Sequence, residues 1–162
     1  SNILSRSLNI ETINLGFSGN GKMEKELAEA LSEIDASCYV IDCGGNLTPQ
    51  LAKERTMPFI TYLKKQKPGV PVLLVEHLIF PTTRFVKETK LRIDSINNAF
   101  KSAYTTLKKE GMKGLYYLPA KDQIGDDGEA TVDGAHLTDV GFMRMSKQME
   151  QILKVILNTS KK

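Results

Sequence analysis

The chain has 162 residues, of which 41% are hydrophobic and 25% are charged, and this balance is typical of one globular domain with its own core. The formal net charge is only +3, and the lysines are spread along the chain instead of forming a block, so no nucleic-acid partner is expected. No apolar stretch approaches the length needed to span a bilayer, and the first residues lack a signal-peptide pattern, so we expect a soluble protein.

Four short apolar runs, rich in branched or aromatic residues, predict buried strands. They are residues 12–17 (TINLGF), 38–44 (CYVIDCG), 70–77 (VPVLLVEH) and 114–120 (GLYYLPA). Amphipathic stretches predict helices over residues 22–34, 48–67, 86–110 and 138–157. The alternation indicates right-handed crossovers and a parallel sheet covered by helices on both faces, which is a doubly wound α/β fold.

No internal repeat and no Pro/Gly/Ser linker divides the chain, so residues 1–162 are expected to form a single domain. The Gly- and Asp-rich residues 125–134 predict one long loop. The acidic side chains in and near it admit a calcium site, but they lack the spacing of a calcium loop, and a solvated loop is the favoured interpretation. These residues are Asp122, Asp126, Asp127 and Glu129.

In parallel α/β sheets the chemistry gathers at the carboxyl ends of the strands. After the first run, the glycines of GFSGNG (16–21) allow backbone N–H groups to approach a ligand, although the order matches neither nucleotide-binding glycine motif. After the second run, DCGGN (42–46) presents the side-chain amide of Asn46 at the strand end. Ordinary turn chemistry explains either motif taken alone.

The stretch VDGAHLTDVGF (132–142) places Asp133 three residues before His136 and directly before a predicted helix. Such a carboxylate can accept from the imidazole Nδ1–H, which fixes the tautomer and leaves Nε2 free to take a proton. The alternative is that His136 only precedes the helix N-cap Thr138 while Asp133 closes a loop. Co-occurrence with the glycine loop and Asn46 favours an acyl-transfer site.

These motifs resemble the SGNH (GDSL-type) hydrolases, which are flavodoxin-like esterases and acylhydrolases. NLGFSGNG resembles the family's second block, GGN its third and DGAH its last. The resemblance implies catalytic roles for Gly19 and Asn46 as oxyanion donors and for Asp133 and His136 as members of a triad, with no metal or cofactor. The likeness is greatest to a bacterial subgroup of polysaccharide-degrading proteins, which implies a small-molecule or carbohydrate-linked acyl ester as substrate.

The sequence departs from the family pattern in two ways. Only 18 residues precede Gly19, whereas the family's nucleophilic serine stands some three dozen residues before that glycine on a turn after the first strand. We therefore expect the first strand and the serine to lie upstream of Ser1, residues 3–9 to be the end of the family's first helix, and the 162-residue fragment to be inactive. Leu47 stands where the third block usually ends in aspartate, which predicts a different attachment for that loop.

The missing strand would leave a gap between residues 12–17 and 38–44 that a second chain could fill, so a homo-oligomer is expected. Ser18 is the best internal candidate for a nucleophile, but its surroundings break the nucleophile-elbow pattern. Two other functions stay open: a non-catalytic module that binds a phosphate or another ligand at residues 16–21, and a catalytically dead scaffold. Glu76 and His77 end the third apolar run and receive no role.

Overall fold

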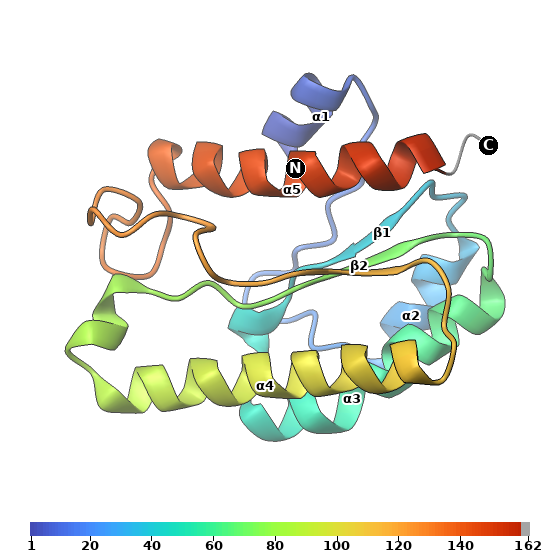
Figure 1. Cartoon of the computed structure of the whole chain (residues 1–162), viewed down its shortest axis with the longest axis horizontal. Helices are drawn as coiled ribbons and strands as arrows, with labels where there is room; N and C mark the ends of the chain where they lie inside the picture. Colours follow the sequence, from blue (N-terminus) through green and yellow to red (C-terminus); the bar gives the residue numbers. More distant parts are fainter. Residues whose placement is uncertain (160–162) are drawn as a thin grey trace.

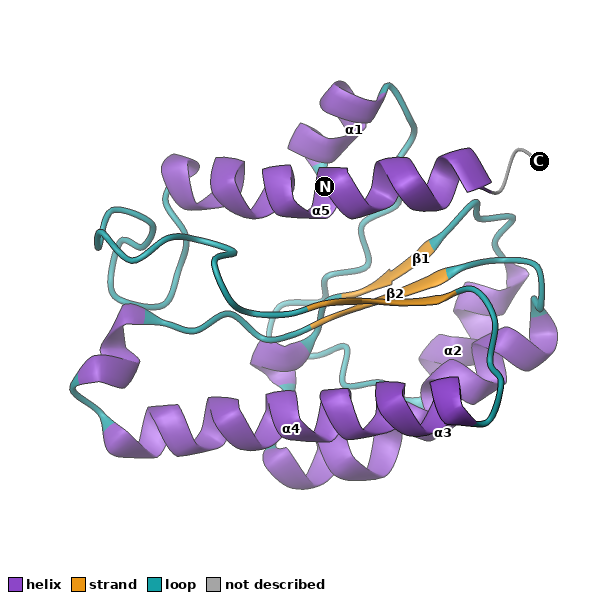
Figure 2. Cartoon of the chain, in the orientation of Figure 1, coloured by secondary structure: helices purple, strands orange, loops and turns teal. Residues whose placement is uncertain are grey.

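Three short parallel strands form the middle layer of the protein in a computed structural model that describes residues 1–159 (Figure 1, Figure 2). The strands are β1 (Tyr39–Ile41), β2 (Val72–Val75) and β3 (Leu115–Leu118), and β2 lies between the other two. Val72 pairs with Tyr39 on one side and with Leu115 on the other. All three carboxyl ends therefore lie at one end of the sheet.

Helices cover both faces of this sheet, as the sequence predicts. The helices α1 (Asn2–Leu8) and α5 (Asp139–Thr159) lie on one face, and α2 (Lys25–Glu33), α3 (Pro49–Gln66) and α4 (Lys87–Lys109) lie on the other (Figure 1). Two single-turn 3-10 helices, η1 (Gly44–Asn46) and η2 (Pro81–Arg84), follow β1 and β2. Within residues 1–159, no helix has the length and apolarity needed to cross a membrane.

Each face of the sheet contributes to its own apolar core, because neighbouring side chains of a strand point to opposite faces. Ile41 and Leu74 pack with Phe100 on the α3 and α4 side, and Leu73 packs against Met149 on the α5 side. Every residue of β2 is fully buried. Each such aliphatic side chain contributes about 1.5–3 kcal/mol on burial, so the central strand is held from both sides.

The predicted strand over residues 12–17 is wrong. These residues belong to a segment without regular structure between α1 and α2, and Ile13 is 61% and Phe17 50% exposed. The chain turns directly after this run, where Asn20 N donates to Phe17 O and Phe17 and Gly19 have φ angles of 33° and 71°, and residues 12–17 pair with no strand of the sheet. An apolar run gains nothing as a strand when no neighbour pairs with it, so residues 12–17 do not form the far side of the expected gap.

One edge of β1 is left open as a result. Tyr39 N donates to Pro71 O at 3.0 Å, and β1 pairs with β2 alone among the described strands. In a parallel ladder alternate residues face the neighbour, so the backbone groups of Val40 face away from β2. The Val40 side chain is 41% exposed, which leaves this strand the least covered part of the sheet.

Candidate active site

Asp133 and His136 form a hydrogen-bonded pair on the loop that precedes α5. Asp133 Oδ2 lies 2.7 Å from His136 Nδ1, while Oδ1 accepts from the backbone N–H groups of Ala135 at 3.0 Å and His136 at 2.8 Å. A carboxylate only accepts, so Nδ1 carries the proton and Nε2 presents a lone pair in the neutral ring. The contact agrees with the geometry expected from the sequence.

The hydrogen bond from the His136 ring, reinforced by the two backbone N–H groups, lowers the pKa of Asp133 well below its usual range. Asp133 is therefore a carboxylate at neutral pH. The His136 side chain is 85% exposed, and among the described residues its only side-chain partner is Asp133. Nε2 is thus free to meet a substrate or a nucleophile.

The contacts expected from the alternative interpretation, a helix cap at Thr138 and a closed loop around Asp133, are present as well. Thr138 Oγ1 accepts from Gly141 N at 3.1 Å and so caps α5, and Thr138 N donates to Ala130 O at 3.0 Å. Val132 N donates to His136 O at 2.8 Å, which closes the loop around Asp133. The loop geometry and the orientation of the imidazole therefore come from the same residues.

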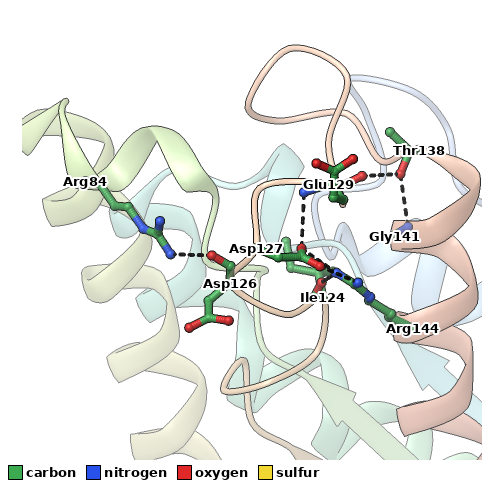
Figure 3. A network of polar contacts seen from close by, with 8 residues as sticks. All are labelled: Arg84, Ile124, Asp126, Asp127, Glu129, Thr138, Gly141 and Arg144. Carbon is green, nitrogen blue, oxygen red and sulfur yellow. Dashed lines mark hydrogen bonds and ion pairs between the residues drawn. The ribbon is translucent and has the colours of Figure 1, made fainter.

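A second group of polar contacts ties the residues 120–131 to α5 and η2 (Figure 3). Arg144 donates to both carboxylate oxygens of Asp127 at 2.7 and 2.6 Å and to Ile124 O at 3.0 Å, and this bidentate pair lowers the pKa of Asp127 to about 2. Arg84 donates to Asp126 O at 2.9 Å. Two arginines thus tie the loop to α5 and η2, while its acidic side chains stay exposed, as expected for a solvated loop. Within residues 1–159 no cluster of metal-ligating side chains is present.

No sequence signal links Arg144 to Asp127, since they lie 17 residues apart with only helix periodicity around Arg144.

The loop that bears Asp133 is anchored on its other side by Thr82, whose hydroxyl donates to Gly134 O at 3.3 Å. Gly134 has a φ of 87°, and a side chain there would overlap the Thr82 methyl group. The site therefore requires glycine at position 134 for both conformation and space.

Asn46 and the glycine loop that contains Gly19 meet near the end of β1. Asn46 lies in η1, and its side-chain amide donates to Asn20 O in the glycine loop. Gly19 has a φ of 71° and is exposed, and its N–H has no partner among the described residues. Two donors, the Gly19 N–H and the second amide hydrogen of Asn46, are therefore available to an oxygen atom. No hydrogen bond joins either of them to His136.

A shallow depression of about 520 Å³ lies beside the glycine loop. Glu24 and Glu26 line it, and carboxylates repel a phosphate. The following helix, α2, begins only at Lys25, so the loop does not lead directly into a helix N-terminus as phosphate sites do. These observations disfavour the phosphate-binding alternative.

The layers, the strand order and the position of the Asp133–His136 loop define a three-layer α/β protein with the SGNH-hydrolase fold. A model of the GDSL-like lipase/acylhydrolase family matches residues 1–154, and the chain belongs to this family. A GDSL-like lipase structure from Bacteroides ovatus is similar over 96% of this chain and 46% of its own length, with 38% identity and a TM-score of 0.91.

Two further solved structures share the fold. The salicylyl-acyltransferase SsfX3 from a tetracycline biosynthetic pathway has 14% identity and a TM-score of 0.79 over 95% of this chain and 48% of its own. A GDSL-like lipase from Bacteroides thetaiotaomicron has 16% identity and a TM-score of 0.66 over 95% of this chain and 80% of its own. The chain thus spans about half the length of the first two. Curated proteins give no significant match.

Proposed function

We propose that the protein is a serine esterase that hydrolyses ester-linked acyl groups, such as acetyl groups on a carbohydrate. The observation that carries the proposal is the 2.7 Å contact between Asp133 and His136, which leaves Nε2 of an exposed imidazole unpartnered. Membership of an acylhydrolase family supports the reaction class. The carbohydrate part rests on the sequence likeness to proteins that degrade polysaccharides.

In the proposed reaction, His136 Nε2 takes the proton of a serine hydroxyl while the serine oxygen attacks the ester carbonyl carbon. The Gly19 N–H and the Asn46 amide donate to the oxyanion that forms, and Asp133 stabilises the imidazolium. The imidazolium then returns its proton to the departing alcohol. Water repeats the sequence on the acyl-enzyme and releases the acid.

The nucleophile in this proposal is a serine outside residues 1–162. Among residues 1–159, no serine or threonine hydroxyl hydrogen-bonds to His136. Ser18 lies in the exposed glycine loop, and Phe17 on one side of it and Gly19 on the other have positive φ angles. Asn20 also stands where the nucleophile-elbow pattern requires a glycine.

Hydrolysis of 4-nitrophenyl acetate by the full-length protein tests the function, and a Ser18→Ala variant tests the nucleophile. We expect measurable turnover in the full-length protein, none in the 162-residue chain, and a kcat for Ser18→Ala within about twofold of the unmodified enzyme. Release of acetate from an acetylated oligosaccharide tests the substrate class. A full-length Ser18→Ala enzyme without activity would identify Ser18 as the nucleophile and contradict the proposal.

We further propose that the open edge of β1 in the 162-residue chain pairs with a second copy. Unpaired backbone groups on a strand edge favour such pairing, and Val40, whose backbone groups face this edge, is 41% exposed. Light scattering at micromolar concentration is expected to give the mass of a dimer. Val40→Lys should give a monomer, whereas Val86→Lys, at an equally exposed valine, should leave the dimer intact. A monomeric unmodified chain would rule out this association.

A further inference from the structure

The loop that bears Asn46 packs directly against His77, the second residue after β2. Gly44 is buried, and a Cβ atom at this position would lie 2.6 Å from the His77 Cβ and 3.1 Å from the His77 Cα. No side chain larger than hydrogen fits there without moving the loop or the β2 segment. The position of the Gly44–Asn46 turn is therefore set by where His77 lies.

His77 is itself held at both its backbone and its ring. Its N–H donates to Asn97 Oδ1 at 2.8 Å, and its carbonyl accepts from Asn97 Nδ2 at 2.9 Å. The ring is buried, with 4% of the residue exposed, and packs edge-on against Phe80 at a centroid distance of 4.8 Å. Asn97 lies on α4, so this helix fixes the carboxyl end of β2.

The His77 ring accepts a hydrogen bond from a cation. Arg92 Nη2 lies 3.2 Å from His77 Nε2, and because a guanidinium only donates, Nε2 must carry the lone pair. Burial, and then the nearby Arg92 charge, lower the pKa of His77 to about 4, against an opposing hydrogen bond at the Leu78 backbone. The imidazole is therefore neutral at neutral pH and acts as an acceptor.

Arg92 extends the same support to the far side of Asn46. Its Nη1 donates to Leu47 O at 3.4 Å, so one guanidinium joins the His77 ring to the residue that follows Asn46. The Leu47 side chain is 2% exposed and offers no polar group to hold the loop. Gly44 on one side of Asn46 and Leu47 on the other are thus both fixed through His77 and Arg92.

We propose that His77 and Arg92 are positioning residues that hold the Gly44–Leu47 loop so that the Asn46 amide faces the ester oxygen. This inference rests on the proposed function, because it assigns the residues to the oxyanion site of the same reaction. Neither side chain touches the substrate. Their effect on catalysis is transmitted through Asn46, and a small displacement of a catalytic donor is sufficient to reduce the rate strongly.

Steady-state hydrolysis of 4-nitrophenyl acetate by the full-length enzyme tests the inference. His77→Leu and Arg92→Leu each remove the bridge, and each should lower kcat roughly 10- to 100-fold with KM changed less than about threefold. His77→Gln restores an acceptor for Arg92 and should recover kcat to within about threefold of the unmodified enzyme. Asn98→Ala, at an exposed position of α4, is the control and should leave kcat unchanged. If His77→Leu fails to fold, Arg92→Leu still removes the bridge and His77→Gln still restores it, so the inference can be tested with these two variants.

A double-mutant cycle separates positioning from general structural damage. In an Asn46→Ala background His77→Leu should reduce kcat by less than about threefold, because the donor that it positions is already absent. An undiminished loss in that background, or an unmodified kcat in His77→Leu alone, would overturn the inference while leaving the esterase intact. Failure of the proposed function would look different, since the unmodified full-length protein would then hydrolyse no 4-nitrophenyl acetate.

Discussion

Replacing His136 with alanine is expected to lower the kcat for ester hydrolysis on the order of 10⁴- to 10⁶-fold, because the general base for both half-reactions is lost. KM should change little, since the imidazole contributes to the transition state more than to substrate binding. The His136 side chain is 85% exposed and supports no core contact, so the variant should fold normally. Steady-state kinetics of the full-length enzyme and its thermal melting temperature measure both effects.

Asp133→Asn provides a sharper test of how the imidazole is held. Oδ1 of Asp133 accepts two backbone N–H groups, and Oδ2 faces His136 Nδ1. An asparagine that keeps the first contacts would direct its NH₂ group at Nδ1 and so favour the tautomer with the proton on Nε2. This tautomer cannot act as base, and a loss of kcat of about 10⁴-fold is expected.

Val132→Ala is the matched control for both variants. Val132 is 75% exposed and enters the loop through its backbone N–H, which donates to His136 O and which alanine retains. Its kcat should stay within about twofold of the unmodified enzyme. If His136→Ala kept more than a tenth of the activity, the Asp133–His136 pair would only close the loop before α5, and the proposed mechanism would be wrong.

The helices α2 to α5 and three of the four expected strands could be predicted from apolar periodicity, whereas α1 is expected only from the family resemblance. β2 is an uninterrupted apolar run that both cores bury completely, and such runs have no other stable location in a protein of this size. The run at residues 12–17 (TINLGF) is interrupted by polar residues and glycine, and it lies in the irregular segment before α2. Periodicity describes what a segment can bury, and whether a neighbouring strand exists for it to pair with is a property of the whole fold.

Within the candidate site, the predictable contacts are local. Asp133 and His136 are three residues apart, so a single turn of the loop brings the carboxylate to Nδ1. The bridge from Arg92 to His77 and Leu47 joins three separate elements, and the pair Arg144–Asp127 joins a helix to a loop. Such contacts depend on the packing of α4 and α5 against the sheet. The presence of Leu47 gave a partial signal, because it indicated that this loop needed another attachment.

A large loss of kcat is also expected when the side-chain amide of Asn46 is removed. Asn46→Ala should lower kcat about 10²- to 10³-fold, the usual result of removing one oxyanion donor. The amide donates one hydrogen to Asn20 O and has a second hydrogen available. The oxyanion forms only in the transition state, so KM should stay nearly constant. Kinetics on 4-nitrophenyl acetate with the full-length enzyme provide the measurement.

Asn46 also links two loops, so the loss of its contact with Asn20 has to be separated from the loss of an oxyanion donor. A boronic acid that mimics the tetrahedral intermediate makes this distinction, because its affinity follows stabilisation of the transition state. In Asn46→Ala the inhibitor should bind about 10²- to 10³-fold more weakly, in proportion to the fall in kcat. Asn46→Asp, similar in shape but unable to donate and negatively charged, should be at least as impaired as the alanine variant. A residue that only joins the loops would instead lower the melting temperature and raise KM, with the inhibitor and the substrate weakened equally.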